Sequence, residues 1–385
     1  MAISAGTNAR ITAVAEATRN TKPGTSPAWG LGRFTSLNIN LEKNILESAE
    51  IRSTRQRADV RHGFNRVTGS LGFQVSHRDH DLYFETLMGS TFATVGTGVA
   101  TLAIDGAANS VTRASGSFVT DGFRPGDQVE LTGFTGSLTD DYTVASVTAT
   151  ILVIVQDIAA TQAAAGTREV DVKGARLGIG TTLKTLHLER GFTDINQFQT
   201  FGGCNVNEMG MSISPEAIAT GTMGIIGMSA AAISGSSSSG TLAATSTNDV
   251  FAAFDGILVE GGAEIAVCTQ LDFSVNNNRS LEGVIGSKFS PDVFDGTAIV
   301  TGSATFFFEN ETLFNKFVNE TESSLSVKLA NPGGTDFLNI SFPRIKYTGA
   351  NIDPPQSGPV RAVFPFEALE PSGGSAIYLQ RSDSA

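Results

Sequence analysis

The tetrapeptide Val67-Thr-Gly-Ser70 occurs a second time, unchanged, as Val300-Thr-Gly-Ser303. Ahead of each copy lies a segment that alternates apolar and polar residues, which is the pattern of a half-buried strand. These segments are Thr35-Ser-Leu-Asn-Ile-Asn40 and Thr269-Gln-Leu-Asp-Phe-Ser274. A long polar loop then leads to the tetrapeptide, which opens a second strand. The order of strand, long loop and strand is therefore present twice.

After each tetrapeptide the apolar spacing changes from that of a strand to that of a short amphipathic helix. The expected helices are Leu82-Tyr-Phe-Glu-Thr-Leu87 and Leu313-Phe-Asn-Lys-Phe-Val318. Asp79 or Asp81 and, in the second copy, Asn310 are the expected N-caps. A repeated pattern implies one supersecondary structure used twice. We therefore expect a mainly β protein with two tandem β-sandwich units, each with a flanking short helix.

The first copy is interrupted, whereas the second runs on into the strand Val360-Arg-Ala-Val-Phe-Pro-Phe366. Residues 92–177 are therefore expected to form an insert at a loop tip, where insertions are best tolerated. Short strand patterns between Gly, Asp and Pro turns predict that this insert is a small β-barrel or sandwich. The predicted divisions are an N-terminal arm (1–33), a first unit (34–91 and 178–232), the insert (92–177), a Ser/Gly-rich linker (233–256), a second unit (257–370) and a C-terminal tail (371–385).

Composition and charge argue against a disordered, nucleic-acid-binding, disulfide-rich or zinc-binding protein. The 385 residues are 41% hydrophobic and 17% charged, which excludes intrinsic disorder. The 26 basic and 38 acidic residues give a net charge of −12, which repels nucleic acid at long range. Cys204 and Cys268 are too few and too far apart for a disulfide framework or a zinc site. Because the sequence shows no leader pattern and no apolar run of membrane-spanning length, we expect synthesis in a cytoplasm.

Catalytic motifs are not found. The chain has no Gly-x-Ser-x-Gly, His-Glu-x-x-His or Walker sequence, so we expect no enzyme activity, no catalytic residue and no cofactor. His77-Arg-Asp-His80-Asp81 has the residue types of a metal site. The matching segment Phe308-Glu-Asn-Glu311 has no histidine, and carboxylates ahead of a helix already favour its N-terminus. We therefore expect no metal.

Taken together, these residues resemble the major tail protein, or tail tube protein, of phages with long non-contractile tails. The resemblance rests on the strand at Leu37, the loop Ser48-Ala-Glu-Ile-Arg-Ser53, the repeated tetrapeptide, the helix at Leu82 and the run Phe201-Gly-Gly-Cys-Asn-Val-Asn207. It implies two tandem tail-tube-type β-sandwich units whose sheets join laterally into rings around a lumen as wide as DNA. Six units usually close such a ring. Three chains with two units each would suffice, and a homohexamer is the alternative.

The resemblance also implies the partners of the chain. It would bind copies of itself within and between rings, and the tail terminator, tail tip and tape-measure proteins. It would be part of the virion tail, assembled in the host cytoplasm, with viral DNA passing through the lumen without specific binding. From the acidic balance we expect more Asp and Glu than Lys and Arg along that lumen. The insert is expected to face outward and to contact the host surface weakly.

The long loops supply the candidate contacts between stacked rings. Arg52, Arg55, Arg57 and Arg61 cluster in an otherwise acidic protein, and no aromatic residue lies among them as a nucleic-acid contact would favour. We expect these arginines to pair with carboxylates of the adjacent ring. The complete set of candidates is Glu47, Glu50, Arg52, Arg55, Arg57, Arg61, Lys288 and Asp292.

Two other function classes remain open at this point. A receptor- or carbohydrate-binding β-module would use the insert, although its clustered aromatics, Phe118, Phe123, Phe134 and Tyr142, mostly sit in strand patterns typical of a core. A capsid decoration protein is the second alternative. The three classes differ in assembly, because only a tail tube protein is expected to form tubes of uniform bore.

Overall fold

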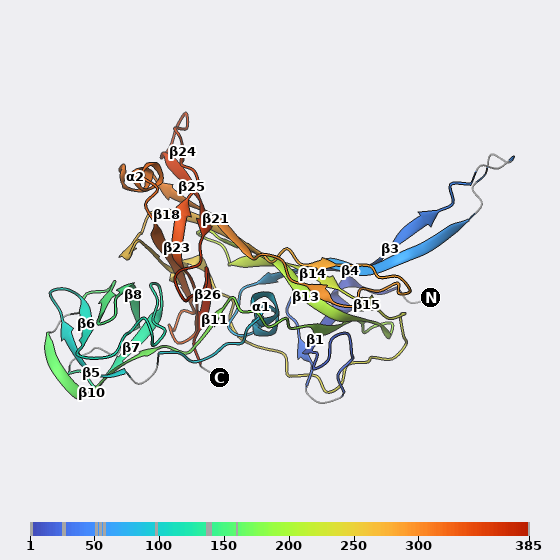
Figure 1. Cartoon of the computed structure of the whole chain (residues 1–385), viewed down its shortest axis with the longest axis horizontal. Coiled ribbons are helices and arrows are strands. Elements are labelled where there is room, and N and C mark those ends of the chain that lie inside the picture. Colours follow the sequence, from blue (N-terminus) through green and yellow to red (C-terminus); the bar gives the residue numbers. More distant parts are fainter. Residues whose placement is uncertain are drawn as a thin grey trace.

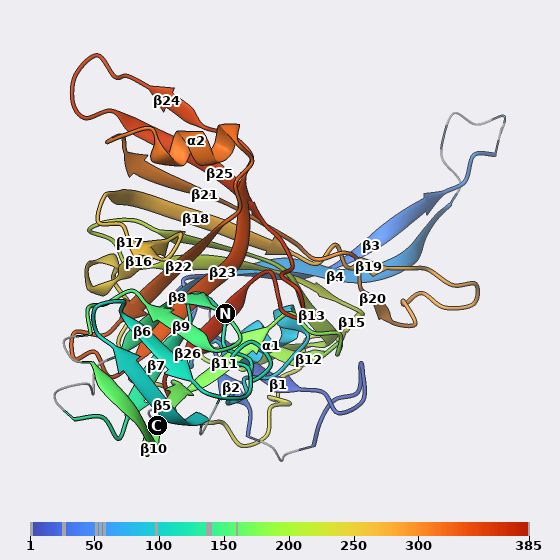
Figure 2. The same cartoon turned by 60° about the vertical axis from the view of Figure 1, so that its left-hand side comes forward.

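The computed structural model describes residues 3–24, 28–50, 53, 56, 59–96, 99–135, 141–158 and 161–383. Strands dominate the chain, and the helices are short (Figures 1 and 2). None of the helices in these ranges has the length and apolar character needed to cross a bilayer. The expectation of a mainly β fold is confirmed.

One antiparallel sheet, here called the long sheet, runs through both units. Its order is β3-β4-β14-β13-β18-β21-β25-β24. The first four strands belong to the first unit and the last four to the second. The strand bounds are β3 (Ser36–Glu47), β4 (Val60–Gln74), β14 (Thr220–Gly227), β13 (Gln197–Ile213), β18 (Cys268–Asn276), β21 (Ile299–Phe307), β25 (Arg361–Ala368) and β24 (Asn351–Asp353). The units meet where β13 pairs with β18.

A second layer covers the inner face of the long sheet. In the first unit, β1 pairs with β2 and β12, and β12 pairs with the first half of β13, which also holds β15. In the second unit, β16 pairs with β17 and β22, β22 with β23, and β26 lies between β23 and β11. The bounds are β1 (Ala9–Ala15), β2 (Gly30–Leu31), β12 (Leu186–Phe192), β15 (Ser229–Ala230), β16 (Ile257–Glu260), β17 (Ala263–Glu264), β22 (Ser323–Ala330), β23 (Phe337–Tyr347), β26 (Tyr378–Arg381) and β11 (Ala175–Gly178).

Both chain ends contribute strands to this second layer. β1 lies in the segment interpreted from sequence as an arm, and β26 lies in the segment interpreted as a tail. Neither segment showed a strand pattern that sequence reasoning could assign, because each strand is recognisable only by its pairing with a distant partner. β1 pairs with β12 in the same way as β16 pairs with β22, so the duplication extends further than the sequence indicated.

The repeated tetrapeptide has the same register in both units. Gly69 lies opposite Ile39 and Ile225, and Gly302 lies opposite Phe273 and Phe366. A Cβ added at Gly69 would stand 1.9 Å from the carbonyl oxygen of Asn38. One added at Gly302 would stand 2.8 Å from the carbonyl oxygen of Asp272. The glycine is therefore required by the close approach of the neighbouring strand in both copies, and the two repeated segments share one register.

The two helices follow the tetrapeptide strands as predicted. They are α1 (Asp81–Met88) and α2 (Thr312–Val318). Asn310 Oδ1 accepts from the Thr312 N–H at 2.9 Å, which satisfies a donor at the start of α2. Asp79 does not cap α1. Its carboxylate instead accepts from Arg33 at 2.8 Å and from Ser76. Asp81 is the first residue of α1 and pairs with Arg381, so both caps predicted for the first copy are wrong.

The insert forms a closed barrel of six strands with a hydrophobic core of its own. Phe118, Phe123 and Tyr142 are buried in that core, and Phe134 packs against it, which accounts for the clustered aromatics. The barrel strands are β5 (Val99–Asp105), β6 (Ser110–Arg113), β7 (Gln128–Thr132), β8 (Tyr142–Val147), β9 (Ile151–Ile154) and β10 (Gln162–Val172). Figure 2 shows the barrel beside the second layer, away from the β3–β4 hairpin.

The Ser/Gly-rich segment lies against the first unit. Glu189 accepts hydrogen bonds from the Ser237 hydroxyl at 2.6 Å and from the backbone of Ser239 at 3.0 Å. Trp29 forms a backbone bridge with Leu242. The composition is that of a flexible linker, but these contacts fasten the segment across the second layer. The remaining elements are the hairpin β19 (Ser280–Leu281) and β20 (Val293–Phe294), and the 3-10 turns Gly6–Asn8 and Ala253–Asp255.

Substituting Gly69 tests the register of the duplicated strands. Gly69→Ala forces a methyl group onto the Asn38 carbonyl and should lower the free energy of unfolding by about 3 kcal/mol, measured from urea denaturation of the soluble subunit. Gly210→Ala is the matched control in the same sheet, since the atom nearest its new Cβ is 4.0 Å away. Equal effects of the two substitutions would contradict the register.

Candidate assembly surfaces

The outer face of the long sheet, here called the polar face, is lined by small polar side chains. Residues of the long-sheet strands alternate between the core and this face, as a strand requires. A shallow depression of about 580 Å³ crosses it from β3 to β21. The polar face includes Ser36, Asn38, Asn40, Thr68, Ser70, Ser212, Thr220, Thr222, Asp272, Ser274, Thr301 and Ser303.

Charged groups on the polar face are few and mostly acidic. Strand alternation and pairing place Glu42, Glu208, Asp272, Asp353 and Glu367 there, against Arg66, Lys346 and Arg361. Glu42 accepts from Thr68 at 2.6 Å and from Arg66 at 2.8 Å. The hydrogen bond from Thr68, together with the Arg66 guanidinium, holds the pKa of Glu42 below its usual value. The face thus carries a carboxylate excess and little positive charge.

The long sheet has an open edge at each end. Among the described residues, β3 pairs only with β4 and β24 only with β25. The two edges lie at opposite ends of the sheet, as Figure 2 shows. Leu37 and Leu41 on β3, and Ala350 and Ile352 at β24, are half-buried side chains on the border of the core. An open strand edge with an apolar border is a template for pairing with another chain.

The β3–β4 hairpin reaches well beyond the body of the protein (Figure 1). Glu47, Glu50 and Arg61 are exposed on its outer part, where Glu47 lies opposite Val60 and Arg61 lies opposite Leu46. Arg61 Nε is 3.6 Å from the Asp59 carboxylate. Three sequence-predicted contact residues, Arg52, Arg55 and Arg57, lie outside the described residues.

The other two predicted contact residues lie near the base of that hairpin. The carbonyl of Lys288 accepts from the Asn65 N–H of β4 at 2.8 Å, and Asp292 pairs with Arg19. Their loop exposes Ile285 fully and Val284 and Phe289 in part. The long loops of both units therefore run along one another, with Glu47, Glu50 and Arg61 further out than Lys288 and Asp292.

The histidines of the candidate metal motif have separate structural partners. His77 Nε2 lies 3.1 Å from the carbonyl oxygen of Ser382, and His80 Nε2 lies 3.1 Å from that of Arg33. Burial lowers the pKa of His80. His187 Nδ1 lies 3.0 Å from the Glu16 carboxylate. Each of these three imidazole rings therefore has a structural contact within the fold.

Arg279, which sequence reasoning missed, joins the two units. It follows β18 and donates from Nη1 to the carbonyl of Thr86 at 3.2 Å and from Nη2 to that of Leu87 at 3.3 Å. The Asn277 amide donates to the same Leu87 carbonyl at 2.8 Å. The Arg279 side chain is only 4% exposed, and burial lowers its pKa. A cation is thus held at the C-terminus of α1, where the helix dipole favours it.

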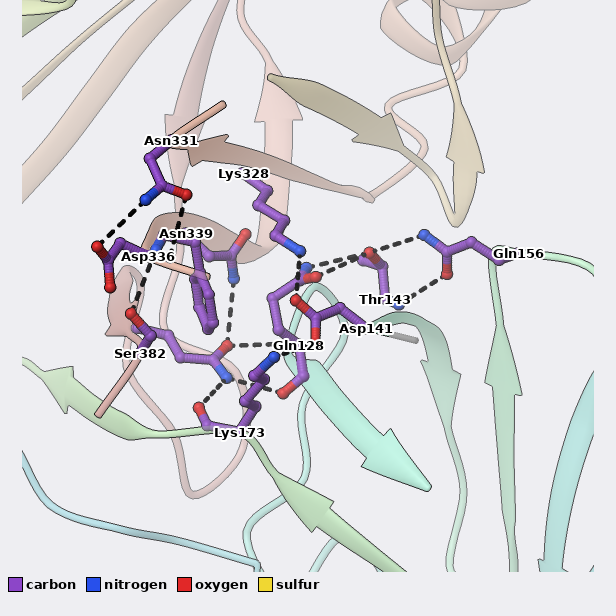
Figure 3. Close-up of polar contacts among 12 residues, drawn as sticks. Gln128, Asp141, Thr143, Gln156, Lys173, Lys328, Asn331, Asp336, Asn339 and Ser382 are labelled. Carbon is purple, nitrogen blue, oxygen red and sulfur yellow. Dashed lines mark hydrogen bonds and ion pairs between the residues drawn. The ribbon is translucent and has the colours of Figure 1, made fainter. Parts of the chain in front are cut away.

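A polar cluster fastens the barrel to the second unit (Figure 3). The Gln380 side chain of β26 accepts from the backbone N–H of Gln128 at 2.8 Å and donates to the carbonyls of Gln128 and Lys173, each at 2.7 Å. The Asn339 amide donates to the carbonyl of Gly126 at 2.8 Å. A Cβ at Gly126 would come within 2.8 Å of Ser341, so the barrel turn packs directly against β23.

Asp141 is the charged centre of this cluster. Its carboxylate accepts from Lys328 of β22 at 2.9 Å and from Lys173 of the barrel (Figure 3). Burial acts to raise the pKa of Asp141, but the hydrogen bonds and charges of the two lysines outweigh it and lower the pKa. Both lysines also lie over the Phe337 ring. The barrel is therefore held in one position on the second unit.

Comparison with known proteins supplies one finding. A family model described as phage tail tube protein matches residues 6–368, nearly the whole chain and both units. A search of curated proteins found no match.

The lowered pKa of Asp141 predicts how the barrel contact depends on pH. Because the pKa of Asp141 is lower in the folded protein than its ordinary value of 3.8, the ionised carboxylate stabilises the fold fully at pH values well above 3.8. This stabilisation is lost as the pH falls from 3.8 through the pKa of the folded state. Asp141→Asn should therefore cost about 2 kcal/mol at pH 7 and much less at pH 3, measured by calorimetry. Glu130→Gln, at another half-buried carboxylate of the barrel, is the control. An equal cost of Asp141→Asn at both pH values would contradict the ion pairs.

Proposed function

The chain belongs to the phage tail tube protein family, and from this premise we propose that three copies close into a ring and that rings stack into the tube of a long non-contractile tail. Membership makes it a structural component of the virion tail that assembles with itself. The observation that carries the proposal is the long sheet, which contains one completed junction between units and leaves an open edge at each end.

Ring closure follows from this arrangement of edges. A head-to-tail contact between different surfaces closes a ring when its rotations add to a full turn. Each chain brings two units of matching topology, so three chains present six units with pseudo-sixfold symmetry. Pairing β24 of one chain with β3 of the next would satisfy both rows of backbone groups. The alternative homohexamer would need twelve units around the bore.

We assign the polar face to the lumen of the tube. Hydroxyl and amide groups offer DNA only weak contacts, and a carboxylate excess repels phosphates. The face spans the long sheet from end to end, so lateral joining of chains would carry it around the whole bore. Viral DNA would then pass without specific binding. The tape-measure protein would occupy the same space before ejection.

Stacking of rings is assigned to the long loops. Glu47, Glu50 and Arg61 on the hairpin would meet the adjacent ring together with Arg52, Arg55 and Arg57. Lys288 and Asp292 near its base would complete the contact. Exposed Leu46 and Ile285 add apolar surface to the same loops. Rim charge pairs set register and orientation more than affinity.

The remaining partners follow from position in a tail. Tail terminator and tail tip proteins would bind the two ends of the tube. The barrel, which docks on the second layer and lies away from the polar face, would face outward and contact the host surface weakly. Assembly would take place in the host cytoplasm.

Electron microscopy of the recombinant chain tests the proposal. We expect negative-stain images of concentrated protein to show tubes of uniform bore, with three chains per ring in averaged cross-sections. Caps or flat sheets would instead indicate a capsid decoration protein, and a monomer at high concentration would exclude the tube subunit altogether.

Adding positive charge to the polar face tests the lumen. Thr222→Lys with Thr301→Lys, both at exposed positions, should make tubes retain short linear DNA in co-sedimentation, with the retention lost at high salt. A closed circular plasmid should not be retained, because it has no end to enter the bore.

The matched control places the same two charges on the barrel. Tubes with Ala163→Lys and Ala164→Lys should retain linear and circular DNA alike, since both residues are exposed on β10. Retention of the circular plasmid by the Thr222→Lys, Thr301→Lys tubes would show that the polar face lies outside.

A further inference from the structure

The junction inside the chain is a complete example of how one unit joins the next. Met211 of β13 lies opposite Phe273 of β18, with Gly210 opposite Ser274 and Ser212 opposite Asp272. Because the two units have the same register at the repeated tetrapeptide, these three positions of the junction have counterparts in the strands at the open edges. The counterparts can be found strand by strand.

β24 is the counterpart of the end of β13. Ile225 lies opposite Gly69, and Phe366 lies opposite the equivalent Gly302, so Ile225 and Phe366 are equivalent. Three residues earlier in each strand, Thr222 is therefore equivalent to Val363. Gly210 lies opposite Thr222, and Asn351 lies opposite Val363. Asn351, Ile352 and Asp353 therefore occupy the positions of Gly210, Met211 and Ser212.

β3 is the counterpart of β18. Ile39 lies opposite Gly69 just as Phe273 lies opposite Gly302. Asn38, Ile39 and Asn40 therefore occupy the positions of Asp272, Phe273 and Ser274. In the single chain, Arg190 Nη1 donates to the carbonyl of Ile39 at 2.9 Å. That oxygen retains a second lone pair for an incoming strand.

We propose that the contact between chains repeats the internal junction, so that β24 of one copy pairs with β3 of the next in the register Asn351–Asn40, Ile352–Ile39 and Asp353–Asn38. This inference rests on the proposed function for the existence of a ring, and it adds the residues and the register that close it. The partner is a second copy of this chain, because β3 of such a copy supplies an edge equivalent to β18.

The side chains brought together in this register are compatible. Ile352 meets Ile39 on the core side, where both strands border the apolar core. On the polar face, Asn351 meets Asn40, and the Asp353 carboxylate meets the Asn38 amide, which can donate to it. No like charges oppose each other, and directly opposed like charges would destabilise a strand pair.

The two helices show where the missing partner sits. Tyr83 and Leu87 of α1 are 3% and 0% exposed, whereas Phe314 and Val318 at the matching positions of α2 are 37% and 56% exposed. The C-terminus of α1 is covered in part by Asn277 and Arg279, which follow β18. By the same register the corresponding residues are Lys43 and Ile45, which lie within the longer strand β3.

Lys43 and Ile45 suit the uncovered end of α2. Lys43 is exposed and supplies an ammonium group, so it would take the place of Asn277 and Arg279 as donor to the last carbonyls of the helix. Ile45 is 60% exposed and would cover Val318. The base of the β3–β4 hairpin therefore belongs to the contact within a ring, and its outer part is left for the next ring.

Paired cysteines test the register directly. Directly opposed residues of antiparallel strands have Cα atoms about 4.5–5.5 Å apart, within disulfide range. Asn40→Cys with Asn351→Cys should therefore give oxidant-dependent covalent links between chains in assembled tubes, seen on non-reducing gels and ending at a three-chain species. The matched control, Asn38→Cys with Asn351→Cys, shifts the pair by two residues and should link poorly. Single-cysteine variants control for the native Cys204 and Cys268.

The outcomes separate this inference from the proposed function. Tubes that form normally but link equally well in the shifted pair, or in neither pair, would overturn the register and leave the tail tube function intact. An unmodified chain that forms no tubes would overturn both.

A second variant addresses the α2 contact without cysteines. Val318→Asp should leave the soluble subunit folded, because Val318 is 56% exposed, but should abolish ring formation in light scattering. Val119→Asp, at a 40% exposed position of the barrel, should assemble normally. Normal assembly of the Val318→Asp protein would contradict the proposed seat for the neighbouring chain.

Discussion

The pairing of β13 with β18 is the constraint on which the architecture depends. A strand carries backbone donors and acceptors along both edges, and in a folded protein nearly all of them find partners. β13 spans 17 residues, and its first half pairs in the second layer while its second half pairs in the long sheet. The second unit covers the far edge of that strand and thereby completes the first unit. The strand in the same place in the second unit, β24, has three residues and no neighbour beyond it among the described strands. The long sheet thus has a fully paired strand at the junction of the two units and an open strand edge at each end.

The two units share the strand register of the long sheet, and they differ in the segments that cover their second layer. In the long sheet, the register at Gly69 and Gly302 is identical, since one added methyl group there would collide with the neighbouring backbone. In the second layer, the Ser/Gly-rich segment covers the first unit, and the barrel with its Asp141 cluster covers the second. In the proposed ring of three chains, the long sheets would therefore approach sixfold regularity, while the outer layer would repeat once per chain.

Sequence reasoning found the features that are written locally. The duplicated tetrapeptide, both helices and the inserted barrel follow from short patterns whose period or composition is distinctive. It did not find β1, β26 or the attachment of the Ser/Gly-rich segment, because these short segments have no distinctive apolar pattern and are recognised only by their contacts with residues distant in the sequence. Arg279 was missed for a related reason: an arginine after three asparagines looks solvated until its side chain is placed on the carbonyls of α1. For the predicted contact residues, the sequence identified the loops that carry them. It did not indicate that Lys288 and Asp292 lie near the base of the hairpin while Glu47, Glu50 and Arg61 lie on its outer part.

In the proposed tube, the charge of the polar face would allow the protein to surround DNA without retaining it. Retention of a polyanion depends chiefly on cations that are free to meet phosphates. On the polar face, Arg66 is engaged by Glu42 at 2.8 Å, Lys346 lies 4.0 Å from the Glu322 carboxylate, and Arg361 lies over the Phe307 ring at 5.7 Å. Neither guanidinium is as available as an isolated surface arginine would be. The neighbouring threonines, serines and asparagines can exchange hydrogen bonds with water as readily as with a passing phosphate, so no position along the face favours stopping. Low adhesion in such a conduit arises from pairing of its few cations and from small neutral groups, with the carboxylate excess as a secondary repulsion.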